Sequence, residues 1–169
     1  RSAEALATRS GRDSETARHW LAAGPAYAGQ AWRAARAAAE QARQVHAYAE
    51  VAELLDAALE SQAMDPTAGP ADRFDLLMPL ADAHRWRAAW DPLQLVVEQA
   101  IAVADELGDV ERLARAASAM TVGALWQSAH FGATHDEVIA ALRRSLAGLP
   151  DSDGELRCRV MLALANELY

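Results

Sequence analysis

The sequence of 169 residues predicts an all-α protein, and three observations support that prediction. About a quarter of the residues are alanine, which has the highest helix propensity and a side chain small enough to let helices pack closely. Apolar residues recur at intervals of three and four, which places them on one face of a helix. The alternating branched and aromatic residues typical of strands are missing. A chain of this length can bury a core of its own, so one domain is expected over residues 1–169.

Capping and turn signals divide the chain into eight expected helices. They cover residues 13–23, 26–45, 48–63, 72–87, 92–107, 110–127, 135–148 and 153–169. In the first half, Asp13 or Ser14 can cap the first helix, and Gly24 ends it. The turn-rich segment 65–70 follows the third helix. Pro79 inside the fourth helix predicts either a kink in its axis or a later helix start, because proline lacks a main-chain N–H.

The second half has equally clear start signals. Asp91 precedes Pro92, and the pair predicts an N-cap followed by the first helical residue. Asp109 is the expected cap of the sixth helix. Thr134 with Glu137 three residues later has the form of a capping box and predicts the start of the seventh helix. Short loops between helices of this length indicate antiparallel neighbours.

Three of the expected helices share one apolar pattern, built on spacings of three and four residues. It reads Tyr48-Val51-Leu55-Ala58, Trp90-Leu93-Val97-Ala100 and, without the aromatic residue, Val138-Leu142-Ser145. Each pattern ends on a small residue followed by a larger aliphatic one, which lets a neighbouring helix approach closely. We therefore expect Ala58 and Ala100 to be buried where helices meet.

These residues resemble the tetratricopeptide repeat, a helix-turn-helix unit of about thirty-four residues. The match is best near residues 74–105, through Leu77, Leu80, Ala81 and His84, then Trp90 at the turn, then Leu93, Val97 and Ala100. The resemblance implies antiparallel helical hairpins stacked as a right-handed superhelix, with units at 13–65, 71–108, 109–150 and an incomplete one at 153–169. The steps from Ala58 to Ala100 and from Ala100 to Ser145 are 42 and 45 residues, longer than the standard unit.

A second resemblance concerns the first third of the chain. The segments His19-Trp20-Leu21-Ala22-Ala23-Gly24 and His46-Ala47-Tyr48-Ala49-Glu50 are similar to the region after the ATPase module in LuxR-type large ATP-binding transcriptional regulators. The maltose-regulon activator belongs to that family. The resemblance implies that the chain is the middle piece of a cytoplasmic bacterial regulator. A signalling NTPase would precede it, and a helix-turn-helix DNA-binding domain would follow.

Charge and residue usage exclude several classes of function. All sixteen basic residues are arginine, so Schiff-base chemistry and a phosphate-loop lysine are impossible within this chain. The net charge of -8 argues against direct nucleic-acid binding. No apolar run is long enough to span a membrane, and no cofactor is expected. The single cysteine, Cys158, is expected to be buried and unreactive in a reducing cytoplasm.

The five histidines do not suggest a metal or catalytic site. His130 and His135 are the closest pair, but they flank a turn instead of sharing a helix face four residues apart. His84 is expected to be a packed, hydrogen-bonded core residue. We expect no catalytic residues and no metal site. A helical-bundle enzyme that uses Asp82, His84 or His130 is the alternative from another class.

One charged face suggests a binding groove. Arg33, Arg36, Glu40 and Arg43 are spaced by three, four and three residues, and such first-helix positions line the concave groove of tetratricopeptide-like stacks. The same register in the later units adds Asp82, Arg85, Trp86, Gln127, His130 and Phe131. The tryptophans are mostly expected in the core, and Trp86 is the one candidate for an exposed ligand anchor. The alternative is a solvated stripe of local ion pairs that holds no ligand.

The leading hypothesis is a non-enzymatic interaction or sensor domain of a cytoplasmic bacterial transcriptional regulator. It would bind a protein or peptide partner, or a small effector, and pass that state to neighbouring domains. It would touch neither nucleic acid nor membrane directly. A general protein–protein scaffold domain from another multidomain signalling protein is the alternative.

Overall fold

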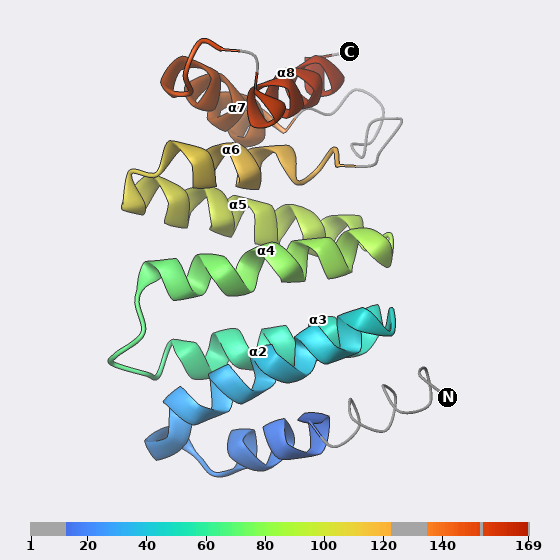
Figure 1. Cartoon of the computed structure of the whole chain (residues 1–169), viewed down its shortest axis with the longest axis vertical. Coiled ribbons are helices and arrows are strands. Elements are labelled where there is room, and N and C mark those ends of the chain that lie inside the picture. Colours follow the sequence, from blue (N-terminus) through green and yellow to red (C-terminus); the bar gives the residue numbers. More distant parts are fainter. Residues whose placement is uncertain (1–12, 123–134, 153, 169) are drawn as a thin grey trace. The chain divides into compact units, whose positions relative to one another are not determined.

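The computed structural model describes residues 13–122, 135–152 and 154–168, and every regular element in these ranges is helical (Figure 1). A first helix covers residues 13–22. It is followed by the short 3-10 helix η1 (Pro25–Tyr27), α2 (Ala28–Gln44), α3 (Tyr48–Gln62), α4 (Pro70–Trp86), α5 (Trp90–Leu107), α6 (Val110–Ser118), α7 (Asp136–Gly148) and α8 (Glu155–Leu168). The described part of the chain contains no strand, so the predicted all-α class is confirmed.

The chain forms two compact units, one over residues 1–88 and the other over residues 89–169. The boundary lies in the turn between α4 and α5, inside the unit that the sequence predicts at 71–108. The helices of that expected hairpin therefore belong to different compact units.

In the first unit, α2 packs against α3 and α3 packs against α4. Successive helices run in opposite directions, so α2 and α4 run the same way (Figure 1). The buried residues of α2 are all alanine apart from Trp32. Because alanine projects so little, the α3 backbone can come close to α2, and the larger side chains Val51 and Leu55 fill the interface.

In the second unit, α5 packs against α6, and α6 packs against both α7 and α8. The small positions of the repeated apolar pattern, Ala58, Ala100 and Ser145, are each 0% exposed, whereas its aromatic position Trp90 is 41% exposed. The Ser145 hydroxyl donates to the carbonyl of Ala141 at 2.8 Å, so its burial leaves no unpaired group. The predicted burial of Ala58 and Ala100 is confirmed.

Several helix ends differ from the sequence-based expectation. α5 begins at Trp90 with Ala89 as its cap, so Asp91 and Pro92 lie in its first turn and Asp91 is not the cap. The main chain turns at Ala88, which has a left-handed φ of 52°. The helix therefore begins at Trp90, two residues earlier than predicted. Pro92 is tolerated there, because first-turn N–H groups have no partner within the helix.

α6 keeps its predicted start and ends earlier than expected. The Asp109 carboxylate accepts a hydrogen bond from the main-chain N–H of Arg112 at 3.0 Å, which confirms the predicted cap. The helix stops at Ser118 instead of near residue 127. The hydroxyls of Ser118 and Thr121 both donate to nearby carbonyls, and such bonds compete with a continuing helix.

The expectation that Cys158 is buried is wrong, because its side chain is exposed. The buried residues of α8 are Val160, Ala163 and Glu167, spaced by three and four. Cys158 lies outside that face, between Arg157 and Arg159. The α7 cap is His135, and the expected cap Thr134 lies outside the described residues. None of the described helices is both long enough and apolar enough to span a membrane.

Candidate functional site

The first unit brings together most of the residues predicted to line a groove. Arg33, Arg36, Glu40 and Arg43 lie on one face of α2, and Asp82, Arg85 and Trp86 lie near the end of α4. The other three predicted residues, Gln127, His130 and Phe131, lie outside the described residues.

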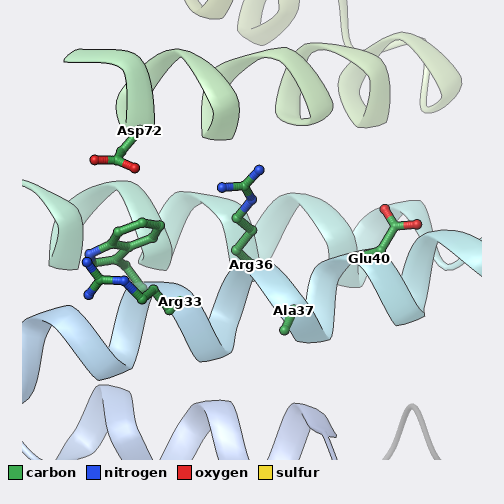
Figure 2. Close-up of a pocket in the computed structure, with 6 residues that line it drawn as sticks. Arg33, Arg36, Ala37, Glu40 and Asp72 are labelled. Atoms are coloured by element: carbon green, nitrogen blue, oxygen red, sulfur yellow. The ribbon is translucent and has the colours of Figure 1, made fainter. Parts of the chain in front are cut away.

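A cavity of about 460 Å³ lies between α2 and the start of α4. Its lining residues are Trp32, Arg33, Arg36, Ala37 and Glu40 from α2 and Asp72 from α4. Figure 2 shows Arg36 reaching from α2 toward α4, while Asp72 projects from α4 into the same space. The cavity is therefore lined by charges of both signs.

Beyond the cavity, oppositely charged residues face each other along α2 and α4. Arg36 contacts Asp75 at 3.4 Å, and the two residues are 39 positions apart. The same separation relates Arg33 to Asp72 and Arg43 to Asp82. We call these six residues the charge ladder. Its α2 members are all arginines and its α4 members are all aspartates, and the two helices run in the same direction (Figure 1).

Local ion pairs accompany the ladder. Arg43 donates two hydrogen bonds to the Glu40 carboxylate, at 2.9 and 2.8 Å. These bonds lower the pKa of Glu40 and raise the pKa of Arg43, to which the charge of Asp82 adds. Arg85 pairs with Asp82 in the same way.

Every predicted groove arginine thus has an acidic partner. Arg33 pairs with Asp65, and the other three pair as described above. Both members of the Arg36–Asp75 pair are nearly half exposed, at 45% and 46% of their side chains. Exposed pairs of this kind contribute about 0–1 kcal/mol, so a ligand group can replace one at little cost.

Asp65 anchors the first end of the groove. Its carboxylate accepts the indole N–H of Trp32 at 2.9 Å and a guanidinium N–H of Arg33 at 3.2 Å. It also accepts the main-chain N–H and the hydroxyl of Thr67, at 3.0 and 2.7 Å. These hydrogen bonds, that of Trp32 foremost, lower the pKa of Asp65 to about 2. A Cβ at Gly29 would lie 2.9 Å from the same carboxylate, so the close approach needs glycine there.

Sequence reasoning missed the role of Asp65. The segment Asp65-Pro66-Thr67 was recognised only as a turn. An aspartate whose carboxylate accepts the main-chain N–H two residues ahead is a recurrent turn motif, so the contact with Thr67 could have been predicted from the sequence. The contact with Trp32, 33 residues earlier, was not.

An aromatic pair joins the last residue of α4 to the first residue of α3. Trp86 is 62% exposed, and its ring stacks on Tyr48 with centroids 5.5 Å apart and planes 8° from parallel. We call this pair the aromatic platform. His46 meets Tyr48 edge-on at 5.9 Å, and the Arg85 guanidinium carbon lies 5.9 Å from the Trp86 ring centre. The sequence identifies Tyr48 only as the first residue of the repeated apolar pattern.

The histidine predicted to be a core residue is indeed buried, since His84 is 7% exposed. Its Nδ1 has no hydrogen-bond partner among the described residues, so the expected hydrogen bond is not made at that atom. Burial lowers the pKa of His84. Among the described residues, no group of three His, Cys, Asp or Glu side chains could hold a metal ion.

Comparisons of the chain with protein-family models, curated proteins and solved structures found no match. The functional argument therefore rests on the geometry of the cavity, the charge ladder and the aromatic platform. Together these three features make up the α2–α4 groove.

Proposed function

We propose that this chain is a non-enzymatic interaction domain that binds an extended segment of a partner protein in the α2–α4 groove. The observation that supports this most is the exposed Trp86–Tyr48 stack at one end of a line of replaceable ion pairs. A large aromatic side chain left in water is costly unless something binds it, and tryptophan and tyrosine dominate the energy of many interfaces.

The distribution of charge favours a protein segment over a nucleic acid. Arginines on α2 face aspartates on α4 along the whole ladder. A polyanion attracted by the arginines would therefore also be repelled by the aspartates. A polypeptide carries charges of both signs and main-chain groups that bond either one. A small effector is the second candidate, since a cavity of about 460 Å³ falls within the usual range for small-molecule sites.

The finer architecture and the biological setting belong to the same proposal. A tetratricopeptide-like stack is supported by the packing order α2, α3, α4, with the first and third helices running in the same direction. The place in a LuxR-type cytoplasmic regulator is supported by the sequence resemblance of residues 19–24 and 46–50. In that setting the groove would report the presence of a partner to neighbouring domains.

Selection from a random dodecapeptide library on the immobilised chain tests this function. Selected peptides should bind the wild type and lose most of their affinity for Trp86→Ala. Trp20→Ala is the matched control, because Trp20 is also exposed, at 36%, and lies outside the groove. If no peptide is selected, or if every selected peptide binds Trp86→Ala as well as the wild type, the proposed function is wrong.

A further inference from the structure

We infer that the α2–α4 groove recognises an extended peptide that carries one carboxylate side chain about five residues from an aromatic side chain. The carboxylate would bind Arg36, and the aromatic ring would stack on Trp86. This inference rests on the proposed function and adds to it the chemistry and spacing of the ligand.

Arg36 is the charged group in the cavity with the weakest attachment. Arg33 donates to Asp65 at 3.2 Å and to the carbonyl of Gly29 at 2.7 Å. Glu40 is held by Arg43, and Asp72 accepts the main-chain N–H of Gly69 at 2.9 Å. Arg36 makes a longer contact, to the Asp75 carboxylate at 3.4 Å.

A peptide carboxylate improves on that contact. A guanidinium has five N–H donors in a planar fork and can hold a second carboxylate through two parallel bonds. Arg36 projects into the cavity between α2 and α4, where such a group has room (Figure 2). Arg36 is therefore the residue we expect to select an acidic side chain.

The ligand group is a monoanion rather than a phosphate. Asp72 and Glu40 line the same cavity as Arg36, and Asp75 contacts Arg36 directly. Three carboxylates around one accessible guanidinium would repel a dianion more strongly than a single carboxylate. Free phosphate and phosphopeptides are therefore predicted to be poor ligands.

The second contact point is the aromatic platform. Tyr48 supports the indole of Trp86 in a parallel stack, so the ring is held in place although it is 62% exposed. An immobilised ring loses little entropy when a ligand binds it. Ring-on-ring contacts contribute more than their buried area alone, which favours an aromatic side chain as the partner.

The spacing follows from the geometry of α4. Asp75 and Trp86 lie on the same face of α4, because residues 75, 79, 82 and 86 follow each other at intervals of three or four. Eleven residues of α-helix span about 16 Å at about 1.5 Å per residue. An extended peptide rises about 3.3 Å per residue, so about five residues cover the distance.

The dodecapeptide selection tests this inference through the sequences it yields. Peptides that depend on Trp86 should carry Asp or Glu four to six residues from Phe, Tyr or Trp. Replacing that Glu by Gln in one synthetic peptide should weaken binding to the wild type about tenfold, the loss expected for one charge-assisted hydrogen bond. The same replacement should change little on Arg36→Gln, which keeps a polar side chain of similar reach.

Arg18→Gln is the control, because Arg18 is an exposed arginine of the same unit, 3.6 Å from Glu50 and outside the groove. Trp86-dependent peptides without the acidic residue or the spacing would overturn the inference and leave the proposed function standing. Competition by inorganic phosphate at the concentration at which acetate competes would overturn the choice of a carboxylate. Failure to obtain any Trp86-dependent peptide would overturn both proposals.

Discussion

The indole N–H of Trp32 donates to the carboxylate of Asp65 across 2.9 Å, and this bond ties α2 to the loop that follows α3. The Arg33 guanidinium lies over the Trp32 ring at 4.3 Å and contacts the same carboxylate. Both arginines of the cavity therefore lie on a helix that this buried acidic group helps to hold against the loop.

Acid should weaken the first unit through Asp65. The folded-state pKa is lowered from 3.8 to about 2, so the stabilisation is complete above about pH 4 and is lost as the pH falls toward 2. Asp65→Asn should lower the melting temperature at pH 7 and remove part of the acid dependence between pH 4 and 2. Circular dichroism melts across this range measure both effects. Equal acid dependence of the wild type and the variant would show that Asp65 does not anchor α2.

Arg36→Gln should leave the fold almost unchanged. The pair with Asp75 is nearly half exposed on both sides, so its loss should cost less than about 1 kcal/mol of unfolding free energy. Urea unfolding of the two single variants, with Asp75→Asn as the second, and of the double variant gives the coupling energy. A coupling above 2 kcal/mol would mean that the pair is structural and too strong for a ligand to replace.

Trp86→Ala should separate binding from folding. Trp86 is the last residue of α4 and its side chain is exposed, so the helical content of the variant should match that of the wild type. A peptide that binds the groove should lose more than about 1 kcal/mol of binding free energy, a factor of five or more. Isothermal titration with one selected peptide measures the loss. Reduced helicity of the variant would point instead to a structural role for the Trp86–Tyr48 stack.

Overpacking should reveal the small-residue contact at Ala100. This residue is 0% exposed, and a leucine there should cost about 1 to 3 kcal/mol because the surrounding side chains must shift. Ala102→Leu is the control on the same helix, since Ala102 is exposed. Urea unfolding compares the two variants. Equal stability of both would contradict close packing of α5 on its neighbours.

His84 should make stability fall in weak acid. Burial lowers its pKa below the ordinary value of 6.5, the charge of Asp56 opposes that shift, and the charge of Arg87 adds to it. The unfolded chain therefore takes up the proton first, and stability decreases as the pH falls below about 6.5, by at most about 1.4 kcal/mol per pH unit. His84→Asn should flatten this part of the curve. Identical slopes between pH 7 and 5 for His84→Asn and the wild type would contradict this account.

Local sequence patterns are enough to predict the all-helical class, most of the helices and the small buried positions where helices meet. Ala58, Ala100 and Ser145 are buried as their spacing predicts, and Asp109 caps α6. These features depend on helix propensity, periodicity and capping, all of which act within a few residues of chain.

Only the tertiary structure decided which charged and aromatic side chains meet. Arg36 faces Asp75, Trp32 bonds Asp65, and Trp86 stacks on Tyr48, in each case across more than thirty residues of chain. The early start of α5 and the exposure of Cys158 also depend on the tertiary structure. The physical reason is that the register between helices depends on loop lengths and on how alanine faces fit together, which no local pattern encodes.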